Sequence, residues 1–181
     1  MIEVPESHEL DLRNRLHRIV NIERCALDMQ PQRVRDLAEE FCHTIRLAQR
    51  VSQVSPGAHP STCHAFAFDL LTTPQLVTPD GHPVVPSAQF VAHMIEHHLC
   101  ESDVPAEGYV VVYFDGESIE HSGRWRSGAV ESKWGSGHVW AHDIFETPSS
   151  YGCVVRFYST LDVARHHELW HAFAAQSFAA T

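Results

Sequence analysis

Hydrophobic residues in the first third of the chain recur every three to four positions, which is the spacing of one helix face. The first stripe comprises Leu12, Leu16, Ile19 and Val20. A longer stripe follows Pro31, a residue type favoured in the first turn of a helix, and comprises Val34, Leu37, Phe41, Ile45 and Ala48. We therefore expect two N-terminal helices, followed by a break at VSPGAHP, residues 54–60.

The middle of the chain predicts two further helices separated by a loop with four prolines, TTPQLVTPDGHPVVP at 72–86. The first is short and runs from Cys63 to Leu71, with Ser61 or Thr62 as its cap. Ser87 is the expected cap of the second, whose inward residues are Phe90, Val91, Met94 and Ile95.

From residue 108 the pattern changes to that of strands. GYVVVYF (108–114) is typical of a buried strand, and Asp115-Gly116 predicts a hairpin turn. ESIEHSGRWR and AVESKW continue as strands on either side of a second turn at Ser127-Gly128, and YGCVVRFYS (151–159) predicts a fourth strand. A last helix is expected from Asp162 to Ser177, with Val163, Trp170, Phe173 and Ala174 on one side. Helices, an antiparallel meander and a final helix together predict an α+β domain.

Composition narrows the function classes. The chain has 181 residues, 44% of them hydrophobic, and no apolar run long enough to cross a membrane. Its first fifteen residues do not resemble a secretory signal, so we expect a cytoplasmic protein. A net charge of −10 disfavours nucleic acid and anionic lipid as partners. Five cysteines without a CxxC pair argue against a disulfide framework or a cysteine zinc site.

Cys63 is the first candidate for chemistry, in the stretch HPSTCHAFAFDL at 59–70. A capped helix start places its thiol beside unpaired backbone amides, which stabilise a thiolate. A thiolate attacks carbonyl carbons, and a neighbouring imidazole would complete its activation. A buried, inert thiol is the alternative, because free cysteines are often buried.

His121 is the candidate imidazole. If Asp115-Gly116 is a two-residue turn, Val110 pairs with His121, and alternation puts His121 on the same face as Val110, Val112 and Ile119. A histidine on this apolar face is either a hydrogen-bonded core residue or a base that faces another group.

The segments STCHAFAFDL and GYVVVYFDGESIEHSGRWRSGAVESKWG resemble the NlpC/P60 superfamily of papain-like cysteine peptidases and amidases. The succession of SKWG (132–135), His142 and Tyr151-Gly152 is similar to that of an uncharacterised branch. The resemblance covers roughly residues 58–158 by order and spacing. It implies a papain-like domain over 56–181, with 1–55 as a helical extension packed on it. It also implies a nucleophile at Cys63 and a general base at His121.

The third residue of such a site is usually a histidine, an asparagine or an acid, whereas Ser132 occupies the matching position here. A two-residue turn at Ser127-Gly128 pairs Gly123 with Ser132 and puts Val130, Ser132 and Trp134 on the face of His121. The Ser132 hydroxyl can then accept a hydrogen bond from one nitrogen of His121. His142, or else His138, is the reserve for this role.

Three other interpretations remain open. His167, Glu168 and His171 match the H-E-x-x-H pattern of zinc hydrolases, but no third ligand is evident downstream, so we expect no metal or other cofactor. A non-catalytic interaction module with the same fold is possible, and so is an acyltransferase with the same Cys/His dyad. The preferred reading is a cysteine hydrolase acting on a peptide or amide substrate.

Overall fold

A computed structural model describes residues 2–3, 7–23, 25–50, 62–72, 76–78, 80–135 and 137–179. Within these ranges, eight strands form one sheet in the order β1-β10-β6-β7-β8-β9-β2, with β5 also pairing with β10, and every pairing is antiparallel. A separate hairpin consists of β3 and β4. The structure is therefore α+β with an antiparallel sheet, as the sequence predicts.

The strands are β1 (Ile2–Glu3), β2 (Arg46–Gln49), β3 (Leu76–Val77), β4 (Pro83–Val84), β5 (Glu101–Ser102), β6 (Val110–Asp115), β7 (Ser118–Arg126), β8 (Ala129–Lys133), β9 (Val139–His142) and β10 (Val154–Tyr158). The α-helices are α1 (Ser7–His17), α2 (Gln30–Glu40), α3 (Cys63–Ala67), α4 (Ala88–His97) and α5 (Val163–Ala179). The π-helical turn η1 (Arg18–Ile22) continues α1, and the 3₁₀ turn η2 (Ser149–Tyr151) precedes β10.

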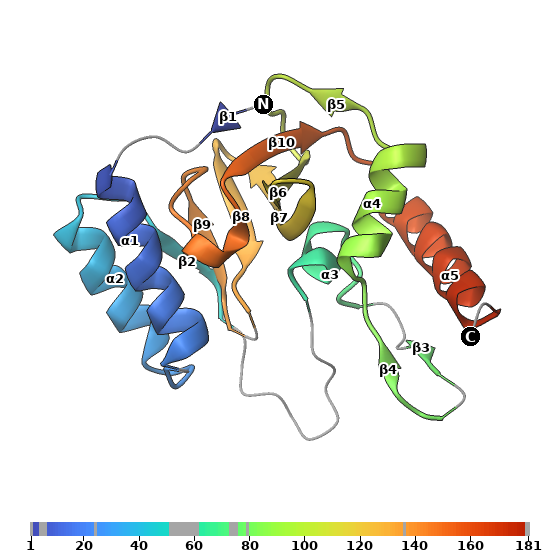
Figure 1. Ribbon diagram of the computed structural model, residues 1–181, viewed down its shortest axis with the longest axis horizontal. Coiled ribbons are helices and arrows are strands. Elements are labelled where there is room, and N and C mark those ends of the chain that lie inside the picture. Colours follow the sequence, from blue (N-terminus) through green and yellow to red (C-terminus); the bar gives the residue numbers. More distant parts are fainter. Residues whose placement is uncertain are drawn as a thin grey trace.

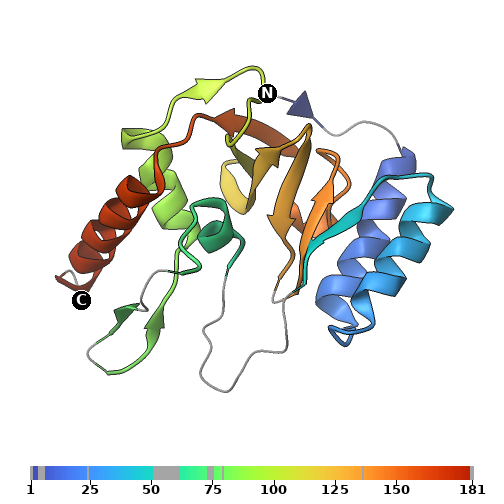
Figure 2. The same ribbon diagram turned by 180° about the vertical axis from the view of Figure 1, so that it is seen from behind.

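Helices cover both faces of the sheet. α1 and α2 lie on one side, and α3, α4 and α5 lie on the other (Figure 1), as the view from behind also shows (Figure 2). On the α1 side, Leu12 and Leu16 pack in one cluster with Trp134 and Trp140. On the α3 side, α3, α4 and α5 contribute to a cluster with the strand residues Val110, Val112, Phe114 and Tyr158. Below, we call these the α1 face and the α3 face.

The N-terminal segment does more than pack on the core. Besides the helices, it supplies β1 and β2, which border opposite sides of the sheet through β10 and β9. The predicted second helix is too long, because α2 ends at Glu40 and Cys42 adopts a left-handed backbone with φ of 59°. Ile45 is buried just before β2, and Ala48 lies within β2. The predicted break at 54–60 lies outside the described residues.

The other helices follow the predictions with small differences. α3 ends at Ala67, because Asp69 takes a positive φ of 54°, so it is shorter than predicted. In α4 the inward residues Phe90, Val91 and Met94 are buried, although Ser87 makes no capping hydrogen bond. In α5 Trp170 and Ala174 are buried as predicted, whereas Val163 is 47% exposed.

The first hairpin differs from its prediction in register. Asp115 pairs with Ser118, so the two loop residues are Gly116 and Glu117. A bulge on β7 then leaves Glu120 without a direct partner and pairs His121 with Tyr113 instead of Val110. An extra residue in one strand reverses which face the following side chains occupy. The second hairpin has the predicted register, with Arg126 opposite Ala129 and Gly123 opposite Ser132. No helix of the described chain has the length and apolar character needed to cross a membrane.

Candidate functional site

Cys63 is the first residue of α3, and Thr62 is the cap predicted for it. The Thr62 hydroxyl accepts a hydrogen bond from the Ala65 amide at 3.0 Å and donates to the Pro86 carbonyl at 3.1 Å. Such a cap satisfies one of the free amides at a helix start. The second bond attaches the start of α3 to the segment before α4. Ser61, the other predicted cap, lies outside the described residues.

Side chains of β7 hold the rest of α3 against the sheet. His64 Nδ1 lies 2.8 Å from the Ser122 hydroxyl. Arg124 donates to the Ala67 carbonyl at 2.8 Å and pairs with Asp69 at 2.5 Å. These contacts place Ser122 and Arg124 on the α3 face. They also fix Cys63 at one position beside β7.

The Cys63 thiol is set among backbone amides. Burial raises its pKa, while the amides of Ser122, His64 and Cys63 itself and the charge of Lys133 oppose that rise. The net direction is upward, so the resting form is the thiol. This differs from the simple expectation of a thiolate stabilised by the helix start, because burial outweighs the amides. A base is therefore needed to remove the proton.

His121 is fully buried, on the α1 face. Its ring stacks on Tyr151 with centroids 3.9 Å apart and lies 5.5 Å from the Tyr113 ring. The prediction that His121 shares a face with Val110 and Val112 is therefore wrong, and the bulge in β7 is the reason. Burial, and then the charges of His64 and His142, hold its pKa well below the usual value. The ring is neutral at physiological pH.

Neither ring nitrogen of His121 has a hydrogen-bond partner among the described residues. A buried polar group without a partner costs about 1–3 kcal/mol, so such groups are rare and call for an explanation. A neutral imidazole with two unused nitrogens can accept a proton at one and donate at the other.

The Cys63 sulfur lies near the backbone beside His121 and makes no hydrogen bond to the His121 ring in the described part of the chain. The amide that contacts the sulfur belongs to the peptide bond between His121 and Ser122. Tyr151 borders both groups, since its ring stacks on His121 and its phenol lies within electrostatic range of Cys63. Within the described residues, no hydrogen bond joins Cys63 to His121. The structure thus brings the two candidates into one neighbourhood, with the imidazole on the α1 face.

Ser132 shares a face with His121, as predicted, although this is the α1 face and not that of Val110, and its hydroxyl bonds other groups. It lies 2.8 Å from His142 Nε2 and accepts from Trp134 Nε1 at 3.0 Å. His142 Nδ1 donates to the Asp143 carbonyl at 2.7 Å, so its Nε2 must accept the Ser132 proton. Burial lowers the pKa of His142 to about 4, which keeps this ring neutral. Nε2 of the other reserve residue, His138, donates a hydrogen bond to the Leu27 carbonyl at 2.7 Å.

Lys133 and Tyr151 are the residues that sequence reasoning missed. Lys133 is the only lysine of the chain, is 1% exposed, and donates to the carbonyls of Gly135 and Gly137 at 2.9 and 3.0 Å. Burial lowers its pKa to about 8, against the opposing effect of Cys63. A single lysine within the predicted strand AVESKW was the available signal for Lys133. Tyr151 was noted only in the Tyr151-Gly152 pair of the resemblance, because its contact with His121 is tertiary.

The H-E-x-x-H residues do not converge on one point. His167 Nε2 donates to the Asp69 carbonyl at 3.2 Å, Glu168 pairs with Arg165 at 2.9 Å, and His171 is exposed. Across the described part of the chain, no group of three or more His, Cys, Asp or Glu side chains is arranged to hold a metal ion.

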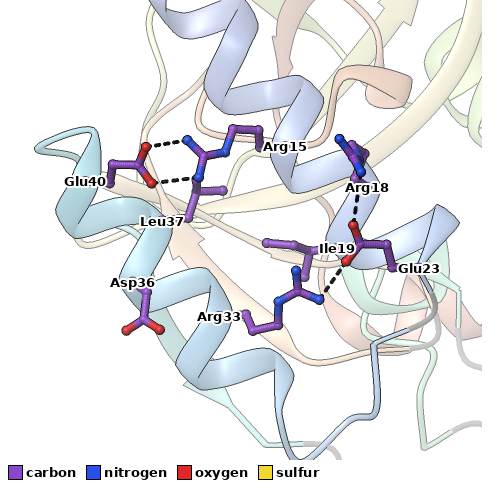
Figure 3. A pocket seen from close by; sticks show the side chains of 8 residues that line it. All are labelled: Arg15, Arg18, Ile19, Glu23, Arg33, Asp36, Leu37 and Glu40. Carbon is purple, nitrogen blue, oxygen red and sulfur yellow. Dashed lines mark hydrogen bonds and ion pairs between the residues drawn. The ribbon is translucent and has the colours of Figure 1, made fainter.

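A polar cavity of about 370 Å³ lies between α1, η1 and α2 (Figure 3), and Cys63 is not among the residues that line it. Arg15 pairs with Glu40 at 2.5 Å, and Glu23 pairs with Arg33 at 2.6 Å and Arg18 at 3.5 Å. Each arginine that lines it therefore has a carboxylate partner, and the Asp36 carboxylate accepts from Gln32 at 2.6 Å.

The chemical features of the site are thus a thiol among backbone amides, a neutral imidazole with unused nitrogens, and a buried ammonium group. The thiol and the ammonium group lie where α3 meets β7 and the end of β8, and the imidazole lies on the α1 face of β7. Comparison of the chain with protein family models, with curated proteins and with solved structures gave no match.

Proposed function

We propose that the protein is a papain-like cysteine hydrolase that cleaves an amide or peptide bond, with Cys63 as nucleophile and His121 as general base. The observation that carries the proposal is the fully buried His121 ring, whose two nitrogens have no partner and whose peptide bond contacts the Cys63 sulfur. A core histidine retained only for packing would be expected to use at least one nitrogen. The net charge of −10 makes a nucleic-acid substrate unfavourable.

The reaction uses the groups as follows. His121 accepts the proton of the Cys63 thiol, and the sulfur attacks the substrate carbonyl carbon to form a C–S bond. The C–N bond then breaks, and the leaving amine takes the proton from His121. Water, deprotonated by the same ring, hydrolyses the thioester and restores the thiol. Amides at the start of α3 are suited to stabilise the oxyanion of each tetrahedral intermediate.

For this reaction the backbone around the β7 bulge must shift so that the His121 ring leaves Tyr151 and reaches the sulfur, because His121 is on the α1 face and α3 covers the other face. Catalytic hydrogen bonds are often absent without substrate and form in the complex. Ser132 acts on this ring only indirectly, because its hydroxyl already bonds His142 and Trp134.

The test is labelling with a peptidyl epoxide that alkylates cysteine nucleophiles, followed by peptide mapping. We expect Cys63 to react first, ahead of the exposed thiols Cys42, Cys100 and Cys153. His121→Ala should slow labelling at Cys63 by about 100-fold, the usual contribution of a general base. Cys153→Ala, a matched loss of an exposed thiol, should leave the rate unchanged. Preferential labelling of an exposed cysteine, or an unchanged rate in His121→Ala, contradicts the proposal and favours the interaction module.

A further inference from the structure

Lys133 is an unusual residue to find in the interior of this chain. All twelve other basic residues are arginines, and the single lysine is almost fully buried. Two carbonyl oxygens, from Gly135 and Gly137, accept from its Nζ. No carboxylate within the described residues forms an ion pair with it. A buried ammonium group without an anion is costly, so an anion formed nearby would be strongly stabilised.

The topology places this ammonium group within electrostatic range of Cys63. Gly123 and Ser132 form the pair of the β7–β8 ladder that is farthest from the Ser127-Gly128 turn. Ser122 and Lys133 occupy the next positions, where the two strands separate. Ser132 is on the α1 face, and strand alternation therefore directs Lys133 to the α3 face, with Ser122. α3 contacts both β7 and β8, and the Ser122 amide contacts the Cys63 sulfur. The thiol and the ammonium group therefore both lie near the end of the β7–β8 pairing, on the side of α3.

We propose that Lys133 is the counter-ion of the Cys63 thiolate, held in place by the Gly135 and Gly137 carbonyls. This inference rests on the proposed function, whose nucleophile it activates. The Cys63 proton goes to His121, and Lys133, whose pKa is about 8, is protonated at neutral pH and is neither acid nor base in the reaction. Two of its three N–H bonds are used by the carbonyls, and the third is available to the sulfur.

Alternative roles for Lys133 fit less well. As a general base it would have to act as a neutral amine; burial lowers its pKa to about 8, but with two carbonyl acceptors it is still protonated at neutral pH. As a purely structural residue it would fix the 135–137 loop and leave the ionisation of Cys63 unaffected. The two roles are separable, because only a counter-ion changes the pH dependence of the thiol.

The first experiment measures the rate of Cys63 alkylation by iodoacetamide from pH 6 to 10, by peptide mapping. In Lys133→Met we expect the profile to move up by about one pH unit, which slows alkylation near pH 7 by about tenfold. Lys133→Arg should recover most of the rate. The control is Arg126→Met, which removes a half-exposed cation that pairs with Glu131 at 3.7 Å, and it should leave the profile unchanged. An unshifted profile in a folded Lys133→Met protein overturns the inference.

A second experiment does not depend on the folding of Lys133 variants. Because the chain has one lysine, ¹³C-lysine labelling gives a single side-chain resonance to titrate. Coupling between two ionising groups is reciprocal, so Cys63→Ala should lower the pKa of Lys133 below about 8. An unchanged titration in Cys63→Ala rejects the counter-ion role. Failure of the proposed function is distinguishable from both results, because it appears as an unchanged alkylation rate in His121→Ala.

Discussion

Replacement of Ser132 by alanine tests whether its hydroxyl stabilises the fold or takes part in the reaction. Its Oγ is fully buried, 2.8 Å from His142 Nε2 and 3.0 Å from Trp134 Nε1. Without it, a buried indole N–H and a buried imidazole nitrogen lose their partner, at about 1–3 kcal/mol for each group. We expect Ser132→Ala to lower the free energy of unfolding by about 3 kcal/mol and Tm by about 6–12 °C.

Thermal and urea unfolding followed by circular dichroism measure this loss. Ser150→Ala is the matched control, because the Ser150 hydroxyl also makes two contacts, with His17 and Asn21, but is exposed. Water replaces its bonds, so its change should stay within about 0.5 kcal/mol. Alkylation of Cys63 should slow less in Ser132→Ala than in His121→Ala. Equal, small stability losses in the two serine variants would refute the reasoning.

Three further predictions concern the same region. Gly123→Ala should lower the free energy of unfolding by about 1–3 kcal/mol in urea titrations, because the new Cβ meets the Glu131 carbonyl at 2.7 Å and the Ser132 Cβ at 2.8 Å. An unchanged urea midpoint would mean that β7 and β8 can move apart at no cost in free energy. Burial lowers the pKa of His64, His142 and His166 to about 4, so the unfolded chain takes up more protons below pH 6.5. Stability should therefore fall from pH 6.5 toward 4, at up to about 1.4 kcal/mol per pH unit for each histidine, and a urea midpoint that is constant or rises would contradict this. Treatment with EDTA should leave both the unfolding midpoint and Cys63 alkylation unchanged, whereas stoichiometric zinc that is lost in a His167→Ala, His171→Ala double variant would restore the zinc interpretation.

Local chemistry in the sequence predicted those parts of the site that depend on neighbours along the chain. Thr62 was one of the two caps predicted for α3, with Ser61, because a hydroxyl residue just before an apolar helical run commonly caps the helix. The Ser127-Gly128 turn was predicted correctly, since both residues take the positive φ values, 51° and 80°, that a two-residue hairpin loop favours. The pairing of Gly123 with Ser132 follows from that turn.

The features that the sequence did not reveal depend on distant parts of the chain. Gly116 takes the first position of the first hairpin loop rather than the second, and the bulge at Glu120 then moves His121 to the other face. Alternation alone cannot reveal an extra residue in a strand. β9 was missed because all four of its residues are buried, so it shows no alternation of polar and apolar positions. The hydroxyl of Ser132 bonds a histidine of this unrecognised strand.

The placement of β1 and β2 at opposite borders of the sheet affects how the chain folds during synthesis. Ile2 pairs with Val155 and Arg46 with Ala141, so these early segments of the chain bind strands that are translated much later. Until then Leu12 and Leu16 lack Trp134 and Trp140, against which they pack. Contacts between such distant positions slow folding, and apolar surface that stays uncovered favours aggregation. The nascent N-terminal helices therefore keep apolar surface uncovered until β8 and β9 have been translated, and we expect chaperones to protect this surface.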